Sequence, residues 1–186
     1  NVMGIDLLSL TAHKVYGPKG VGALYVKARP DLQVAPLIVG GGQEHGQRSG
    51  TVPVPLAAGL GEACAIAQVE MKTEAASLSA LRERLFLRLA EQLPTIRRIG
   101  HEEQRLPGNI NVCIPGLPAE QLLVKMPELA LSSASACSAG GGVPSHVLGA
   151  LGLEPEVAEC CFRVGLGRAT TESEIDRAAD LIGTAA

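Results

Sequence analysis

The first stretch of the chain able to do chemistry is residues 9–20, which read SLTAHKVYGPKG. Lys14 follows the apolar run 5–10, beside hydroxyl and imidazole side chains, and precedes a turn rich in glycine and proline. A lysine whose stem enters an apolar wall tends to lose its proton, and the neutral amine can attack a carbonyl carbon to form a Schiff base. The alternative is a solvated surface lysine, which is the commonest state of this residue type.

A second stretch, residues 40–51, reads GGGQEHGQRSGT. Backbone amides freed by glycine suit an anion, and Arg48, Ser49 and Thr51 would add further donors. The alternative for such a glycine-rich loop is a flexible connection.

A third stretch, residues 131–142, consists of small residues around a single thiol, Cys137. Free cysteine is usually buried, so a thiol in a loop without bulky neighbours is unusual. By composition alone, an idle thiol in a linker is the simpler interpretation.

A fourth stretch, residues 161–167, alternates between apolar and other residues, so that Arg163 shares a strand face with glycines. This arrangement leaves room for a carboxylate beside the guanidinium. Arg163 could equally be a plain surface cation.

Together these stretches resemble the cysteine desulfurases. Residues 9–20 match the family's cofactor-lysine segment, residues 40–51 match Gly-Gly-Gly-x-Glu-x-Gly-x-Arg-Ser-Gly-Thr, and residues 132–138 with 144–152 match the segment around its reactive cysteine. The departures are Ala134, where the family usually has glycine, and the glycine run 140–142. Neither departure removes a reacting group.

The resemblance implies one role for each candidate residue. Lys14 would carry the Schiff base with pyridoxal 5'-phosphate and move the α-proton of the substrate. Thr11 and His13 would bind the cofactor phosphate, and Thr51 would reach the phosphate bound by the other subunit of a dimer. Cys137 would accept sulfur, and Arg163 would hold the substrate carboxylate.

The fold implied is α/β, of the pyridoxal phosphate-dependent aminotransferase fold type I. Residues 1–70 would be the rear part of the large cofactor-binding domain, and residues 71–186 the small C-terminal domain with the cysteine loop. The activity implied is conversion of L-cysteine to L-alanine, with sulfur left on the enzyme as a persulfide for iron-sulfur cluster assembly. The partners implied are a second copy of the chain and an iron-sulfur scaffold or other sulfur acceptor.

Composition narrows the class of protein. With 186 residues, 46% hydrophobic and a net charge of −3, the chain can bury a core but offers no basic groove for nucleic acid. We expect no metal site, because the five cysteines form no Cys-x-x-Cys pair, and no membrane span, because no apolar run is long enough. A cytoplasmic location is expected. The chain begins at Asn1, almost directly before a strand, so we expect a fragment that is inactive alone.

Apolar spacing predicts the elements that position these residues. Nearly continuous apolar runs at 5–10 and 21–26 predict strands buried on both faces. Two helical stripes, at 56–67 and 78–89, predict two helices, with Arg82, Glu83, Arg84 and Arg88 on a solvated face. Period-two alternation predicts a half-buried strand at 110–114. Short helices are predicted at 119–126 and 144–151, and a capping box at 171–174 predicts the start of the last helix.

Two other classes of function remain open at this point. A cysteine hydrolase could use Cys137 with His13 or His146, but this leaves Lys14 without a role. A non-catalytic fragment could instead dock a sulfur acceptor or scaffold.

Overall fold

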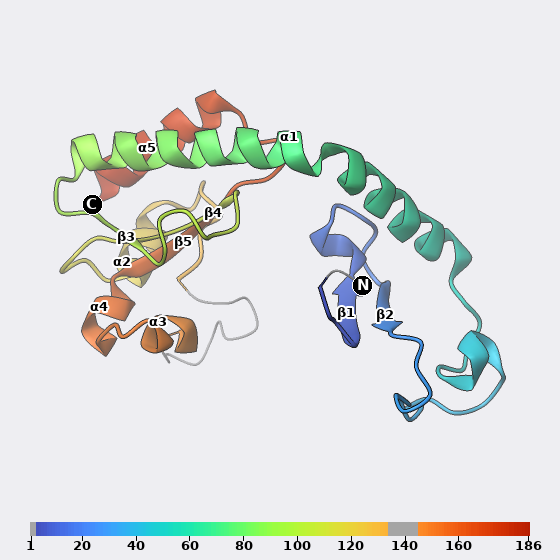
Figure 1. Cartoon of the computed structure of the whole chain (residues 1–186). Helices are drawn as coiled ribbons and strands as arrows, with labels where there is room; N and C mark the ends of the chain where they lie inside the picture. Colours follow the sequence, from blue (N-terminus) through green and yellow to red (C-terminus); the bar gives the residue numbers. More distant parts are fainter. Residues whose placement is uncertain (1–2, 134–144) are drawn as a thin grey trace. The chain divides into compact units, whose positions relative to one another are not determined.

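The computed structural model describes residues 3–133 and 145–186, so Cys137 lies outside the described residues. The chain divides into two compact units, Asn1–Met71 and Lys72–Ala186. Figure 1 shows the order of the elements along the chain. The assignment of residues 1–70 to a large domain and 71–186 to a small domain stays a prediction. In the described part of the chain, no helix combines the length and hydropathy of a membrane span.

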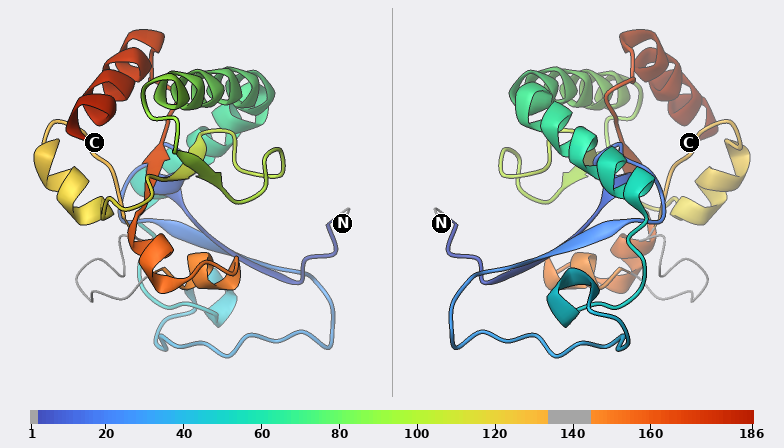
Figure 2. Two further views of the ribbon diagram at one scale, coloured as in Figure 1. Left: turned by 90° about the vertical axis from the view of Figure 1, so that its left-hand side faces the viewer. Right: turned by 90° about the vertical axis from the view of Figure 1, so that its right-hand side faces the viewer.

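The first unit is built on an antiparallel hairpin. Strands β1 (Leu7–Thr11) and β2 (Gly22–Val26) pair with Thr11 opposite Gly22, and they run side by side in Figure 2. The 3-10 turn η1 (Ala12–Lys14) leaves the end of β1. A Cβ at Gly22 would lie 2.5 Å from the Leu10 carbonyl oxygen, so only glycine allows this close pairing.

The hairpin differs from the predicted strands in its burial. We predicted strands covered on both faces, but the leucines of β1 and Leu24 of β2 are exposed, with Leu8 at 43% and Leu24 at 51%. The physical reason is that, within the described residues, these two strands form a sheet of only two, paired with each other. The two strands are apolar enough to be buried on both faces, but the hairpin alone does not bury them.

The two predicted helices are one. Helix α1 (Val54–Gln92) continues for 39 residues, through the predicted boundary near residue 70. The prediction of separate helices was wrong because it relied on two apolar stripes. No glycine or proline lies between Glu62 and Leu93, so nothing in the sequence interrupts the backbone hydrogen bonds.

The second unit is a three-stranded antiparallel sheet in the order β3 (Arg97–Ile99), β4 (Asn109–Cys113), β5 (Cys161–Gly165). One face packs against α1, α2 (Ala119–Lys125) and α5 (Glu172–Ala185), around the fully buried Phe162, Leu85 and Ile182. Near the other face lie the short helices α3 (His146–Ala150) and α4 (Pro155–Glu159). The predicted alternation of β4 is confirmed, because Ile110 and Val112 are buried while Asn109 and Asn111 are only half-buried.

The charged residues of α1 do not form the solvated face we predicted. Arg84 donates two hydrogen bonds to Asp176, at 2.8 and 2.7 Å, and Arg88 donates one to Asp180 at 3.0 Å. These pairs join α1 to α5. On the other side of α1, Glu83 accepts hydrogen bonds from Arg98 at 3.0 and 2.6 Å. The prediction was wrong because the carboxylates and the Arg98 guanidinium come from distant parts of the sequence.

Arg82 is also part of this network. Its side chain is buried and donates hydrogen bonds to the Leu106 and Pro107 carbonyl oxygens and to Glu83. Burial by itself would raise the pKa of Glu83, but hydrogen bonds from Arg98 and Arg82 outweigh that effect and lower it.

The capping box of α5 is confirmed. The Thr171 hydroxyl accepts a hydrogen bond from the Glu174 amide, and the Glu174 carboxylate accepts one from the Thr171 amide at 2.8 Å. Ile175, Ala179 and Ile182 follow as the buried stripe of the helix, as predicted. The sequence therefore determines both the start of α5 and the face that it buries.

Replacing Thr171 by alanine should lower the free energy of unfolding of the second unit by about 1 kcal/mol, because the Glu174 amide at the start of α5 loses the hydroxyl that accepts its hydrogen bond. Urea denaturation followed by circular dichroism would measure this. Thr73→Ala, at an exposed position inside α1, is the control and should leave stability unchanged or slightly higher. Equal losses in both variants would contradict the capping role.

Stability should also fall in acid through Asp176. The hydrogen bonds from Arg84 lower the pKa of Asp176 below its ordinary value. A carboxylate with a lowered folded-state pKa stabilises the fold fully above its unfolded pKa of about 3.9, and this contribution is lost as the pH falls below that value. Asp176→Asn should therefore be less stable than the parent at pH 7, and the difference should shrink towards pH 3. A difference independent of pH would show that the ion pair contributes nothing.

Candidate functional site

Lys14 lies on a tight turn whose backbone is held by Ala12. The Ala12 amide donates a hydrogen bond to the Val21 carbonyl oxygen at 3.0 Å, and the Ala12 carbonyl oxygen accepts one from the Gly17 amide at 2.9 Å. Ala12 is fully buried. A Cβ at Gly17 would approach the Ala63 side chain of α1 to 3.2 Å, so the turn packs closely on that helix. These contacts fix where the backbone of Lys14 lies.

The side chain of Lys14 is exposed, and its amine makes no hydrogen bond or ion pair with any residue that the structure describes. The predicted apolar wall around its stem is therefore wrong for this chain, because Lys14 ends a 3-10 turn in the loop that connects the two strands of the hairpin. The amine is left available. Beside it, a hydrogen bond of 2.9 Å joins the Thr11 hydroxyl to Nδ1 of His13.

The predicted anion loop is closed on itself by hydrogen bonds. The Ser49 hydroxyl, buried in the loop, donates to the Gly41 carbonyl oxygen at 2.7 Å, and the Ser49 and Gly50 amides donate to the Ile38 carbonyl oxygen and to Gln43 Oε1. These two amides are therefore unavailable to an anion. The Thr51 side chain, at the end of the loop, is exposed and forms no hydrogen bond with the described residues. The loop thus holds Thr51 in place without using its hydroxyl.

The second unit contains a cavity of about 340 Å³ beside the β3–β4–β5 sheet. Its polar lining comes from four parts of the chain: His101, Gln104, Arg105, Asn109, Asn111, Ser133, Ser145, His146 and Arg163. Val147 and Leu148 of α3, Ile99 of β3, Gly100 and Leu151 line the remainder. Pockets of this size accommodate small organic molecules.

Arg163 is the predicted site residue that this cavity contains. It is half-buried in β5, and its backbone exchanges hydrogen bonds of 2.7 and 3.2 Å with Ser132. Its guanidinium has no ion-pair or hydrogen-bond partner in the described ranges 3–133 and 145–186. The ionisable side chains among the described residues that line the cavity are two arginines and two histidines, with no carboxylate. The cavity is therefore suited to an anion such as a carboxylate.

Several polar residues of the lining were missed from the sequence, His101, Arg105 and Asn111 among them. His101 Nδ1 accepts hydrogen bonds from the Glu103 and Gln104 amides, so its other ring nitrogen carries the proton. Arg105 donates to the His101 and Ile99 carbonyl oxygens at 2.7 and 3.1 Å, and burial together with the nearby Arg98 and Arg82 lowers its pKa. Asn111 lies on β4 opposite Arg163. Spacing gave no signal for these residues, because tertiary pairing alone brings them to one cavity.

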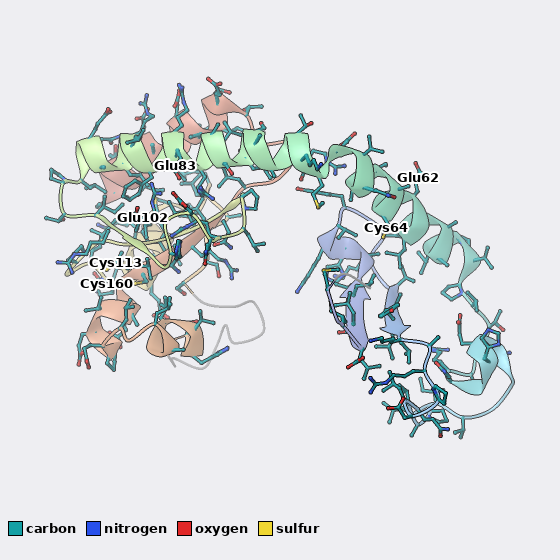
Figure 3. The ribbon with its side chains drawn as sticks, in the orientation of Figure 1. Glu62, Cys64, Glu83, Glu102, Cys113 and Cys160 are labelled. Atoms are coloured by element: carbon teal, nitrogen blue, oxygen red, sulfur yellow. The ribbon has the colours of Figure 1, made fainter. Side chains whose placement is uncertain are left out.

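Three of the other cysteines are buried thiols. Cys113, Cys160 and Cys161 gather where the sheet meets α4, and Figure 3 shows Cys113 and Cys160 close together there. Burial raises the pKa of Cys113, and it raises that of Cys161 to about 12. A thiol with so high a pKa stays protonated near neutral pH and is a poor nucleophile. Cys64, on α1, is exposed.

Comparison with known proteins decides the family. The aminotransferase class-V family model matches residues 1–178. The chain belongs to the aminotransferase class-V family. The fold class predicted from the sequence is confirmed with it, since a solved structure of a NifS-like protein superposes on 98% of the chain with a TM-score of 0.85 and 32% identity. Aminotransferase class-V proteins of this type depend on pyridoxal phosphate.

The curated relatives of this class-V chain are cysteine desulfurases, which confirms the resemblance found in the sequence. A cysteine desulfurase of Rattus norvegicus is 47% identical over 176 residues, covering 95% of the chain and 39% of the relative. The solved structure of SspA in complex with cysteine matches 88% of the chain and 44% of SspA, with a TM-score of 0.64 and 37% identity. The chain thus spans about two fifths of the length of this curated relative. The roles of Lys14, Thr11, His13, Thr51, Cys137 and Arg163 stay predictions.

Proposed function

We propose that the chain is part of a pyridoxal phosphate-dependent cysteine desulfurase, which converts L-cysteine to L-alanine and transfers the sulfur to a cysteine of the enzyme. The observation that carries this proposal is the Lys14 turn. It presents an amine without a partner among the described residues next to a hydroxyl and an imidazole that are hydrogen-bonded to each other. The desulfurase relatives support the choice of this activity over a cysteine hydrolase.

The residues of the turn fit pyridoxal phosphate by their chemistry. The cofactor requires an amine for its aldehyde and hydrogen-bond donors for its phosphate, and Lys14, Thr11 and His13 supply these groups within four residues. When bound, pyridoxal phosphate withdraws electrons from the Cα of the substrate and so allows the α-proton to leave. Thr51 would donate to the phosphate bound by a second subunit, because its hydroxyl forms no hydrogen bond with the described residues.

Lys14 and Arg163 would act on different groups of the substrate. The Lys14 amine would take the proton from the substrate Cα and later return one. Arg163 holds the substrate carboxylate with two parallel N–H donors. The solved structure of SspA with cysteine supports cysteine as the substrate. The absence of acidic residues among the described lining of the Arg163 cavity favours the same assignment.

Cys137 would receive the sulfur. Its thiolate attacks the sulfur of the substrate, the carbon–sulfur bond breaks as the sulfur–sulfur bond forms, and the substrate carbon takes up a proton. L-cysteine and one enzyme thiol thus give L-alanine and one enzyme persulfide, with no external oxidant. The raised pKa values of Cys113 and Cys161 make these thiols unsuitable for the attack.

The wider setting is part of the same proposal. The enzyme acts as a homodimer in the cytoplasm and passes its sulfur to an iron-sulfur scaffold or another acceptor protein. Residues 1–70 belong to the large domain and residues 71–186 to the small domain.

Borohydride reduction of the complete protein with bound pyridoxal phosphate should attach the cofactor permanently to Lys14, because Lys14 is the lysine adjacent to the Thr11–His13 pair. Peptide mapping by mass spectrometry would locate the label. Lys14→Ala should lower kcat for alanine formation by about 100-fold or more, since the proton transfer loses its base. Lys19→Ala, in the same turn, is the control and should retain activity. A label on Lys19 would overturn the assignment.

Cys137→Ser should abolish alanine formation while leaving the cofactor absorption band unchanged, because a hydroxyl is a far weaker nucleophile towards sulfur than a thiolate. Alanine release and enzyme-bound sulfur would be measured together. Cys64→Ser is the control, since Cys64 is an exposed thiol on α1 and should be dispensable. Turnover of Cys137→Ser at the parent rate would exclude Cys137 as the sulfur acceptor.

A further inference from the structure

Two polar groups in the Arg163 cavity lack partners among the described residues. The side-chain oxygen Oδ1 of Asn111 is buried, and no hydrogen bond to it is found among the described residues. The guanidinium of Arg163 is similarly without a partner in that part of the chain. Both residues line the same cavity. Buried polar atoms are usually paired, so an open acceptor beside an open donor calls for an explanation.

The sheet places these two side chains next to each other. Asn111 on β4 is directly opposite Arg163 on β5. The backbone hydrogen bonds between the two strands, on both sides of this pair, join even-numbered residues. The Leu166 amide donates to the Gly108 carbonyl oxygen at 2.7 Å, and the Ile114 amide donates to the Cys160 carbonyl oxygen at 3.2 Å.

The backbone of Arg163 instead bonds Ser132, on its other side. Asn111 and Arg163 are therefore a non-hydrogen-bonded pair. In such pairs the two side chains lie on the same face, and their Cβ atoms are about 4.5–5.5 Å apart.

The guanidinium needs an acceptor of this kind. It carries five N–H groups, and a bidentate carboxylate uses two of them. When a ligand fills the cavity and displaces water, the remaining N–H groups must find acceptors in the protein. Among the described residues that line the cavity, no carboxylate competes for this role.

We propose that Asn111 is the positioning residue of Arg163. Its Oδ1 accepts a guanidinium N–H that the ligand does not use, and so holds the fork towards the carboxylate of the substrate. The amide is neutral, so it orients Arg163 and leaves the positive charge for the substrate. An aspartate at this position would pair with Arg163 and cancel that charge. This inference rests on the proposed function only in naming L-cysteine as the carboxylate ligand.

The chain offers a matched control. Asn109 is the same residue type, on the same strand and lining the same cavity, but it is opposite Gly165, which has no side chain. Asn109 thus has no cross-strand guanidinium to orient.

In the complete protein with bound cofactor, Asn111→Ala should raise KM for L-cysteine about 10-fold, because one hydrogen bond to a charged group is lost. The value of kcat should change by less than about 2-fold, and the cofactor absorption band should not move. Asn109→Ala should leave KM within about 2-fold. Asn111→Asp, which preserves the shape of the side chain, should raise KM at least as much as alanine does. A normal KM for Asn111→Asp would indicate a packing role and overturn the proposal.

A double-mutant cycle tests the dependence on Arg163 without requiring turnover. The probe is 3-mercaptopropionate, a thiol carboxylate without the α-amine, and calorimetry gives its Kd for the parent, Asn111→Ala, Arg163→Ala and the double variant. If Asn111 acts through Arg163, its substitution should weaken binding in the parent and have no effect in the Arg163→Ala background. Additive losses would overturn the proposal. If the two substitutions are coupled in binding but the complete protein forms no alanine from L-cysteine, the proposed desulfurase activity is overturned and the positioning role of Asn111 still holds.

Discussion

The pairing register of β4 with β5 is the constraint on which the second unit depends. It places Ile110, Val112, Phe162 and Val164 on the face that packs against α1, α2 and α5, and Asn111, Cys113, Cys161 and Arg163 on the opposite face. A shift of one residue in either strand would exchange its two faces, so the core and the Arg163 cavity would be lost together. Burial of the apolar face thus fixes the position of the guanidinium.

Charge pairing separates the structural arginines from Arg163. Arg82, Arg84, Arg88 and Arg98 each have a carboxylate partner within 3.2 Å. The pair of Arg98 joins β3 to α1, and the pairs of Arg84 and Arg88 join α1 to α5. Arg163 has no such partner among the described residues, although it is half-buried, as Arg84, Arg88 and Arg98 are. A half-buried arginine without a partner among the described residues is costly, and a carboxylate ligand would remove that cost.

The thiols are separated in the same way by their surroundings. Cys113 and Cys161 continue the face of Asn111 and Arg163, but they lie where α3 and α4 cover the sheet. Burial there keeps the two thiols protonated. On this one sheet face, Cys113 and Cys161 therefore serve packing, whereas the neighbouring Asn111 and Arg163 serve ligand binding.

The sequence by itself determined the local features of this protein. The capping box at Thr171, the alternation of β4 and the segment around Lys14 each depend on residues a few positions apart, so their chemistry can be read directly from spacing. The family was also within reach of the sequence, because its motifs are contiguous. The tertiary structure decided what depends on distant residues. It merged two apolar stripes into α1, gave the arginines of that helix their partners from residues 98 and 176–180, and placed Asn111 opposite Arg163. The exposure of Lys14 could not be predicted from the sequence either. Residue spacing predicts the turn, but the burial of a turn depends on which elements surround it.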